Sequence, residues 1–202
     1  MFIAIEGSDG AGKSTQFDAL VEWLRQTGQT VTVCRDPGTT ATGEAVRDVL
    51  LHREDLAIDR RAEMFLFMAA RAQMVAEVIR PAIERGEVVI SDRFLLSNVV
   101  YQGHAGGMPI ELIWEIGAAA TDGLMPDLTI ILDVDRETAA GRLGGDPDRM
   151  ERMGDDFHER VRQGFLAEAR EPRYPTILVD TTEPIDTVKA TIREAVEPLL
   201  EK

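Results

Sequence analysis

Short apolar runs alternate along the chain with longer stretches in which apolar residues recur at helical spacing. The runs suited to buried strands are Met1–Glu6, Thr30–Cys34, Glu87–Ser91, Asp127–Val134 and the weaker Thr176–Val179. Helical patterns fill the intervals, at Phe17–Leu24, Glu44–Leu51, Asp59–Arg85, Leu95–Tyr101, Pro109–Ala120, Arg136–Leu143, Asp156–Arg170 and from Pro184 to the C-terminus. Because strands that alternate with helices form parallel sheets covered on both faces, the pattern predicts an α/β fold with a five-stranded parallel sheet.

Glycine and proline punctuate this pattern. Gly28 is expected to end the first helix, and Gly86 to end the long third one, which Pro81 is expected to kink. The segment Gly144–Asp155 mixes glycine with charge and is the best candidate for a short mobile lid. Since no internal repeat, linker or low-complexity tract is found, residues 1–202 are predicted to form one domain.

The turn after the first strand carries a phosphate-binding pattern. The stretch Ile5–Thr15 reads IEGSDGAGKST, which fits G-x-x-x-x-G-K-[ST] in full. In such a loop, backbone N–H groups surround phosphate oxygens, the lysine reaches the outer phosphates and the hydroxyl binds Mg²⁺. It lies between a strand and a helix N-terminus, where the helix dipole favours anions. The residues expected to bind ATP are Gly7, Ser8, Gly10, Ala11, Gly12, Lys13, Ser14 and Thr15.

Two further strands end in polar residues. Arg35 and Asp36 follow the second strand, and Asp92 and Arg93 follow the third. In parallel sheets, ligands bind beyond the carboxyl ends of the strands, so these side chains are expected to face the phosphate-binding loop.

The composition of the chain excludes several classes of binding partner and site. The net charge of −14 argues against duplex nucleic acid or an anionic membrane as the main partner. The single cysteine, Cys34, excludes an intramolecular disulfide, and the three histidines have no metal-ligand spacing. With no signal peptide and no long apolar span, a soluble cytoplasmic protein is expected.

Motifs beyond the loop narrow the class of phosphate-binding protein. A guanine-specific switch normally carries an Asn-Lys-x-Asp element, and the chain has no Asn-Lys pair. Four other stretches are distinctive: RDPGTTATGEAVR (35–47), FMAARAQ (67–73), SDRFLLSNVVYQG (91–103) and DRME (148–151). On these stretches the chain resembles the bacterial thymidylate kinase family from Met1 to the last helix, most specifically in its D-R-F and Y-Q-G block and its R-A-Q helix.

The resemblance implies a P-loop kinase that phosphorylates dTMP to dTDP with ATP and Mg²⁺, in the biosynthesis of dTTP. Lys13 would hold the ATP β- and γ-phosphates, while Ser14 would bind Mg²⁺, supported by Asp92. Arg93 would bind the acceptor's 5′-phosphate, and Asp9 would face the 3′-hydroxyl of the sugar. A carboxylate in an anion-binding loop needs a cation or hydroxyl partner.

The resemblance also implies a thymine pocket. Phe67 would stack on the base, and Arg71, one helical turn later, would donate to a base carbonyl. Asn98 and Gln102 would read the remaining edge, and Tyr101 would crowd the position of a 2′-hydroxyl. The remaining residues expected to contact dTMP are Asp36 and Arg47, although a solvated helix face is an alternative for Arg47.

A transition-state arginine is expected in the lid. Some family members carry it inside the phosphate loop, where this chain has Gly10. The candidates are Arg142, Arg149 and Arg152, with Arg149 favoured because it lies in the matched D-R-x-E motif. An Arg149→Ala change would then lower kcat far more than nucleotide affinity.

Three positions depart from the family pattern. Thr39 replaces a glycine, so the turn must be reshaped if that glycine adopts a positive φ. Leu96 replaces a frequently acidic residue, and Gly106 replaces an arginine. These changes put efficiency and acceptor preference in question more than reaction type.

Alternatives remain for function and assembly. The chain could phosphorylate another deoxynucleoside monophosphate, or bind nucleotides with little transferase activity. The resemblance implies a homodimer, and the apolar helices near Met64–Ile79 and Ile110–Ala120 suit an interface between two subunits. Burial within one subunit explains those helices equally well.

Overall fold

The computed structural model describes residues 1–53, 55–142, 144, 149–150 and 152–200, and it is built around one parallel sheet. The sheet has five strands in the order β2-β3-β1-β4-β5, which confirms the predicted fold class. The strands are β1 (Phe2–Gly7), β2 (Val31–Arg35), β3 (Val88–Asp92), β4 (Leu128–Asp133) and β5 (Thr176–Asp180). Each lies within two residues of its predicted bounds.

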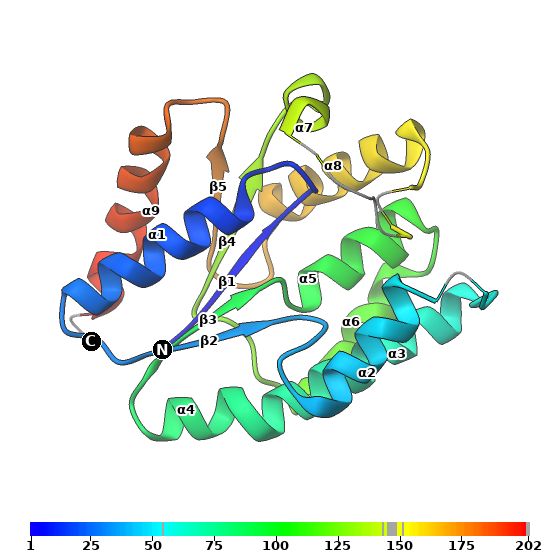
Figure 1. The fold of residues 1–202 in the computed structure, drawn as a ribbon, viewed down its shortest axis with the longest axis horizontal. Helices are drawn as coiled ribbons and strands as arrows, with labels where there is room; N and C mark the ends of the chain where they lie inside the picture. The colour runs from blue at the N-terminus through cyan, green and yellow to red at the C-terminus, as the bar shows by residue number, and fades with distance from the viewer. Residues whose placement is uncertain (54, 143, 145–148, 151, 201–202) are drawn as a thin grey trace.

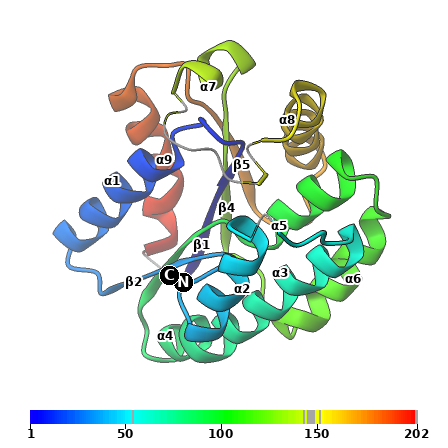
Figure 2. The ribbon, with the colours of Figure 1, turned by 45° about the vertical axis from the view of Figure 1, so that its right-hand side comes forward.

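Helices connect the strands and cover both faces of the sheet (Figures 1 and 2). They are α1 (Lys13–Gln26), α2 (Ala41–Leu51), α3 (Arg60–Met74), η1 (Val75–Ile79), α4 (Arg80–Glu84), α5 (Leu95–Asn98), η2 (Val99–Ala105), α6 (Ile110–Thr121), α7 (Arg136–Arg142), α8 (Asp155–Arg170) and α9 (Ile185–Leu200). Among the described residues, no helix is both long and apolar enough to cross a membrane.

Alternating side chains of β1 separate the two cores. Phe2 and Ala4 pack into the cluster beneath α3, α5, α6 and α8, while Ile3 and Ile5 pack beneath α1 and α9. In Figure 1, α1 and α9 lie together on one side of the sheet, while α2, α3, α5, α6 and α8 lie on the other. Because the central strand is buried on both faces, its sequence is apolar until Glu6.

Two helices contain π-helical segments that periodicity did not predict. The long helix expected at Asp59–Arg85 is present as α3, η1 and α4, with its widened turn immediately before Pro81. A proline removes one helical hydrogen bond, and the π-helical turn accommodates that loss. The helix predicted to end at Tyr101 instead continues through η2 until Gly107, whose φ of 79° supplies the terminating turn.

Helix caps explain two other boundaries. Asp59 accepts a hydrogen bond from the Arg61 N–H at 2.9 Å, as its predicted capping role requires. The second helix starts at Ala41, three residues earlier than predicted, because Thr40 caps it by accepting from Gly43 N–H at 2.9 Å.

Parts of three predictions fall outside the described residues. Leu143, the expected end of the helix that begins at Arg136, is one of them. Within the predicted lid, residues 145–148 and 151 also lie outside, including Asp148 and Glu151 of the D-R-M-E motif. The last helix is described to Leu200, two residues short of the C-terminus.

Candidate active site

The phosphate-binding loop joins β1 to α1, as the sequence predicts. Gly10 and Gly12 have φ values of 81° and 82°, which side chains rarely tolerate. A Cβ atom at Gly10 would lie 2.5 Å from the Ala139 carbonyl oxygen, so α7 packs directly against the loop. This close packing places the first backbone N–H groups of α1 at the carboxyl end of the central strand.

Lys13 is folded back onto its own loop. Its Nζ donates to the Ser8 carbonyl at 2.9 Å and to the Gly7 carbonyl at 3.1 Å, and lies 3.5 Å from Asp9 Oδ1. Burial and the nearby Arg93 charge lower the pKa of Lys13. In this conformation the ammonium group is therefore occupied by contacts within its own loop.

Asp9 has both kinds of partner that a carboxylate in an anion-binding loop needs. Arg93 donates to its Oδ1, and the Tyr101 hydroxyl donates to its Oδ2 at 3.0 Å. Burial opposes ionisation, but the charges of Arg93 and Lys13 outweigh it and hold the pKa of Asp9 below its usual value. The structure thus brings Asp9, Arg93 and Tyr101 together at the end of the central strands.

Arg93 itself is fixed from several sides. Its Nη1 donates to the Gly7 carbonyl and the Ser97 hydroxyl, each at 3.1 Å, and its guanidinium lies 5.1 Å from the centre of the Tyr101 ring. Its backbone is left-handed, with φ of 68°. A strained backbone of this kind persists only where surrounding contacts hold it.

Glu6, expected from the sequence only as a strand residue, contacts the residues that follow Arg93. Its fully buried carboxylate accepts from the Phe94 N–H at 2.8 Å, the Ser97 hydroxyl at 2.6 Å and the Ser97 N–H at 3.3 Å. Glu6, a residue of β1, therefore caps the N-terminus of α5. Burial raises the pKa of Glu6 to about 7. A charged residue at the end of an otherwise apolar strand was the available signal.

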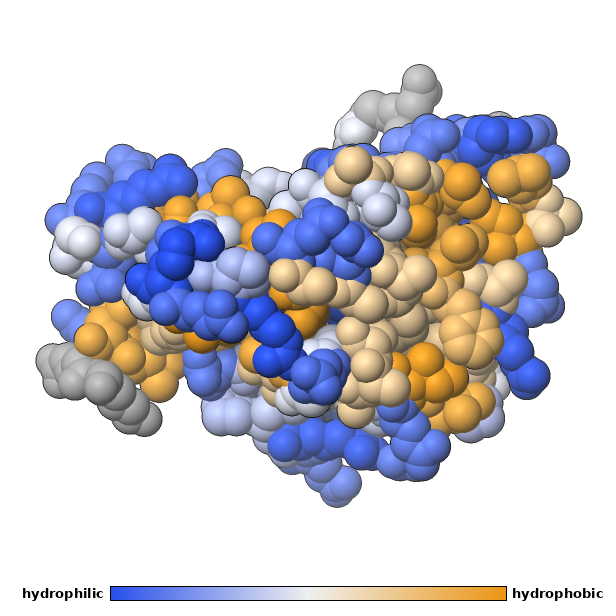
Figure 3. All heavy atoms as spheres, turned by 90° about the horizontal axis from the view of Figure 1, so that it is seen from below, coloured by the Kyte–Doolittle hydropathy of each residue, from blue (hydrophilic) through white to orange (hydrophobic). Residues whose placement is uncertain are grey.

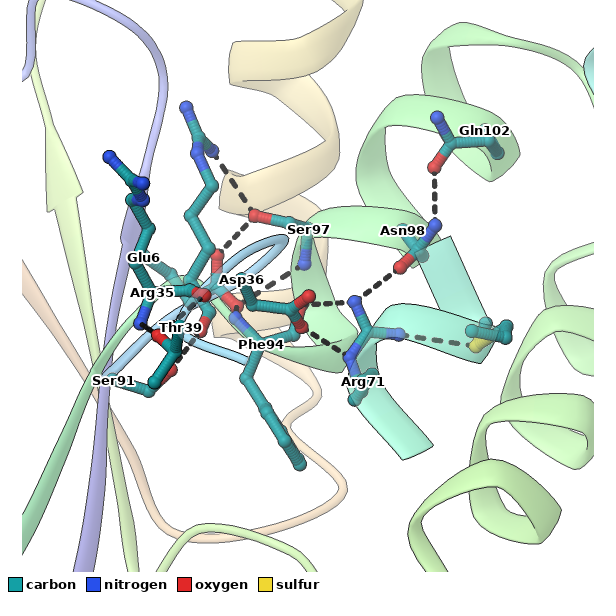
Figure 4. Close-up of polar contacts among 12 residues, drawn as sticks. Glu6, Arg35, Asp36, Thr39, Arg71, Ser91, Phe94, Ser97, Asn98 and Gln102 are labelled. Atoms are coloured by element: carbon teal, nitrogen blue, oxygen red, sulfur yellow. Dashed lines mark hydrogen bonds and ion pairs between the residues drawn. The ribbon is translucent and has the colours of Figure 1, made fainter. Parts of the chain in front are cut away.

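A continuous chain of buried polar side chains forms the other end of the site, and Figure 4 draws its part from Asp36 through Arg71 and Asn98 to Gln102. Arg71 Nε donates to Asp36 at 2.5 Å, and its Nη2 donates to the Asn98 carbonyl at 2.5 Å. Asn98 donates to Gln102 at 2.8 Å, and Gln102 donates to Glu63 at 2.8 Å. We call these five residues the polar row. Burial raises the pKa of Asp36, and the adjoining charge of Arg71 opposes this rise.

The phosphate loop and all members of the polar row except Glu63 line one cavity of about 550 Å³. The predicted site residues that line it are Asp9, Gly10, Gly12, Lys13, Ser14, Thr15, Asp36, Arg47, Phe67, Arg71, Asp92, Arg93, Asn98, Tyr101, Gln102 and Arg142. Phe67 is half-buried, so it faces the cavity from α3 rather than filling the core. The cavity thus has one phosphate-binding end and one end with an aromatic ring beside an arginine and two amides.

Three predicted ATP-binding residues are not among the lining side chains. Gly7 and Ser8 face the loop through the carbonyl groups that hold Lys13. Ala11 is buried in the core cluster beneath α1. Their predicted contribution is a backbone one.

Ser14 and Asp92, the two predicted metal ligands, both line the cavity. Asp92 Oδ1 is buried and has no hydrogen-bond partner among the described residues, although buried carboxylate oxygens normally have one. The described residues contain no group of three or more His, Cys, Asp or Glu side chains that could hold a metal. A hydroxyl from Ser14 and a carboxylate from Asp92 fit Mg²⁺, because this ion keeps several waters and phosphate oxygens in its coordination shell.

The lid arginines lie in different places. Arg142 donates to the Thr181 carbonyl at 2.8 Å, and its Nη1 is 3.5 Å from the Gly10 carbonyl oxygen of the phosphate loop. Arg149 donates to the Leu50 carbonyl at 2.7 Å and to Glu63. Arg152 is exposed. Neither Arg149 nor Arg152 is among the described residues that line the cavity.

Comparisons with known proteins agree with this geometry. The family model for thymidylate kinase matches residues 5–192. A thymidylate kinase of Leifsonia xyli is 46% identical over 197 residues, covering 96% of this chain and 92% of that protein. One from Deinococcus radiodurans is 44% identical, covering 97% of this chain and 96% of that protein. The chain belongs to the thymidylate kinase family.

A solved structure supports the same assignment. The crystal structure of thymidylate kinase from Ehrlichia chaffeensis superposes with a TM-score of 0.78 at 30% identity. The match covers 97% of this chain and 98% of that one, so the P-loop kinase fold extends over nearly the whole chain.

The three departures from the family's motifs have local explanations. Thr39 adopts a φ of 69° itself, and its hydroxyl accepts from the Arg35 N–H at 2.7 Å, which pins the turn. Leu96 is buried in the apolar core on the α6 side of the sheet. A Cβ at Gly106 would lie 2.5 Å from the Gln102 carbonyl oxygen, so this backbone favours glycine.

Proposed function

We propose that this chain transfers the γ-phosphoryl group of ATP to the 5′-phosphate of dTMP, giving ADP and dTDP. One observation carries the proposal: a single cavity holds a phosphate-binding loop at one end and the buried polar row at the other. Phosphoryl transfer needs two phosphates in line, with their charges neutralised and their positions fixed. Membership of the family supplies the substrate class.

The donor nucleotide binds at the phosphate loop. The N–H groups of the loop and of α1 surround its phosphates, and Lys13 turns from the Gly7 and Ser8 carbonyls to the β- and γ-oxygens. Ser14 and Asp92 would hold Mg²⁺, whose charge would offset that of the phosphates.

The acceptor binds between Arg93 and the polar row. Arg93 and Arg47 hold its 5′-phosphate, while Asp9 faces the sugar. Thymine lies on the Phe67 ring with its edge toward Arg71, Asn98 and Gln102. The buried Tyr101 hydroxyl, bound to Asp9 at 3.0 Å, leaves little room beside the sugar and favours a deoxyribose.

An arginine near the loop stabilises the charge of the transferred group. Arg142 is nearest to this role in the described conformation, since its Nη1 is 3.5 Å from the Gly10 carbonyl oxygen. Arg149 and Arg152 remain predicted contributors that would have to approach when the lid closes. Comparing kcat for Arg142→Ala and Arg149→Ala distinguishes them, and the larger loss identifies the transition-state residue.

A coupled ADP-release assay with Mg²⁺ and ATP tests the activity. It compares dTMP with dUMP, dCMP, dGMP, UMP and no acceptor, with Lys13→Met as the control for contaminating kinases. We expect strong preference for dTMP. Preference for another acceptor would overturn the substrate assignment, and ADP release without any acceptor would overturn the transferase activity.

A homodimer formed by α3 and α6 is a further part of this proposal. Apolar side chains gather on the side of the molecule where these helices lie (Figure 3). Exposed apolar residues recur along α3 at Ala62, Phe65 and Ala69 and continue into η1 at Ala76, and Phe65 is 50% exposed. We expect sedimentation to give a dimer that Phe65→Glu dissociates. A wild-type monomer would contradict it.

The one sheet shared by all five strands supports a single kinase domain over residues 1–202. The buried free thiol of Cys34 suits the reducing cytoplasm in which the protein is proposed to act.

A further inference from the structure

The polar row does not end at the residues expected to contact thymine. Gln102 Nε2 donates to Glu63 Oε1 at 2.8 Å, and Arg149 donates to the other oxygen of the same carboxylate. Glu63 is only 7% exposed, and Asn98 and Gln102 are 1% and 3% exposed. Nothing in the sequence pattern singled out Glu63, which occupies the first turn of α3.

The charged groups on either side of the two amides, Arg71 and Glu63, fix the orientation of Asn98 and Gln102. A guanidinium has only donors and an ionised carboxylate has only acceptors. Arg71 therefore requires the carbonyl oxygen of Asn98, which turns the amide nitrogen of Asn98 toward Gln102. Gln102 must then accept with its carbonyl and donate its own N–H to Glu63. Only one orientation of the two amides satisfies every contact.

This direction decides what the cavity offers a base. Both amide carbonyls are engaged inside the row, while each amide nitrogen retains a second N–H. The row therefore presents mainly donors. A 4-keto pyrimidine carries an acceptor at C4, whereas a 4-amino pyrimidine carries a donor there.

We propose that Glu63 is a specificity-determining positioning residue that orients Gln102, and so selects 4-keto over 4-amino pyrimidine acceptors. The inference rests on the proposed base pocket. Reversing the Gln102 amide in the native protein would place its carbonyl against Glu63 and its nitrogen against the nitrogen of Asn98. These two unfavourable contacts oppose any orientation in which Gln102 would present an acceptor to the base.

Arg149 completes this arrangement. By donating to Glu63 Oε2, it leaves Oε1 for Gln102, and its own Nε is held by the Leu50 carbonyl at 2.7 Å. A buried carboxylate without a cation is costly, so the pair keeps the acceptor end of the row charged.

A structural role for Glu63 makes a different prediction. An acidic residue in the first turn of a helix favours the helix dipole, whatever ligand is bound. Losing only that effect would weaken activity with every acceptor by the same factor. The ratio of kcat/KM for dTMP to that for dCMP therefore separates the two roles.

The test is E63Q assayed with dTMP and dCMP. Glutamine has nearly the same shape but offers an amide as well as a carbonyl, so reversal of Gln102 meets one conflict instead of two. We expect the dTMP-to-dCMP ratio to fall about tenfold, the loss of roughly one hydrogen bond. The change should lie mainly in KM. An unchanged ratio, with equal losses for both acceptors, would overturn the proposal.

Two further variants complete the experiment. N98A tests the base pocket itself: if it leaves the ratio unchanged, the proposed pocket is wrong. If N98A lowers the ratio and E63Q does not, only the role of Glu63 is wrong. The double variant E63Q/R149Q removes both members of the ion pair between Glu63 and Arg149. It replaces E63Q if that single variant does not fold, and we expect it to lower the dTMP-to-dCMP ratio by the same factor.

Discussion

The two ends of the cavity differ in how complete they are. In the polar row, Arg71 and Asp36 are each 1% exposed at the side chain, and hydrogen bonds extend without a break to Glu63. At the phosphate loop, the cationic groups bind the protein's own carbonyls and Asp9. The base end is preassembled, whereas the phosphate end must exchange its contacts.

The difference follows from what each end must do. A base is recognised by donors and acceptors that must not reorient, so a buried row whose members are joined by hydrogen bonds provides specificity. Phosphates bring their own charge and displace the temporary partners of Lys13 and Arg93. Substitutions should therefore act mainly on catalysis at one end and on stability and base recognition at the other.

The largest effect should come from Lys13→Met. Removing this cation takes away one of the positive charges that offset the charge of the transferred group, and we expect kcat to fall by on the order of 10³–10⁵-fold. Affinity for dTMP, measured by calorimetry, should stay within about threefold of the native value because the polar row is untouched. An equal loss of dTMP affinity would mean that the two ends are not independent.

Arg71→Met tests the other end. It leaves Asp36 buried without its cation, and breaking such a pair costs about 3–5 kcal/mol of unfolding free energy. Arg35→Met is the matched control, because its ion pair with Glu44 is about half exposed, at 48% and 49%. That change should cost about 1 kcal/mol or less. Similar losses in urea denaturation would contradict the contrast.

The element pattern and the phosphate loop could be predicted from sequence because they depend on local periodicity and spacing. Glu6 and Glu63 could not, since their partners come from distant segments: Glu6 binds Phe94 and Glu63 binds Gln102. Periodicity treats both as ordinary members of a strand and a helix turn. Their roles arise only when the sheet brings those segments together.

Glu6 joins the two ends, and it gives a pH effect of intermediate size. Burial raises its pKa from 4.5 to about 7, so the folded state keeps a proton that the unfolded chain loses. Stability from this group is present below pH 4.5 and is lost as the pH rises through 7, by about 3 kcal/mol.

Glu6→Gln removes this dependence. The difference in unfolding free energy between E6Q and the native protein should therefore move in favour of the variant as the pH rises from 4.5 to 7.5. Chemical denaturation at several pH values measures it. A difference that stays constant over this range would show that Glu6 ionises normally.

The smallest effect concerns the turn beside Asp36. Thr39 is held at a φ of 69°, so both Thr39→Gly and Thr39→Ala lose the hydroxyl bond to Arg35, but only glycine relieves the strain. We expect T39A to be less stable than T39G by about 1 kcal/mol in urea denaturation. Equal stabilities would mean that the turn relaxes once the hydroxyl is lost.

The most direct test is a crystal structure with dTMP, Mg²⁺ and a non-hydrolysable ATP analogue. The account predicts that the hydrogen bonds from Asp36 through Arg71, Asn98 and Gln102 to Glu63 are unchanged. It also predicts that Lys13 Nζ has left the Gly7 and Ser8 carbonyls for phosphate oxygens. A rearranged row, or a Lys13 that keeps its carbonyl contacts, would contradict it.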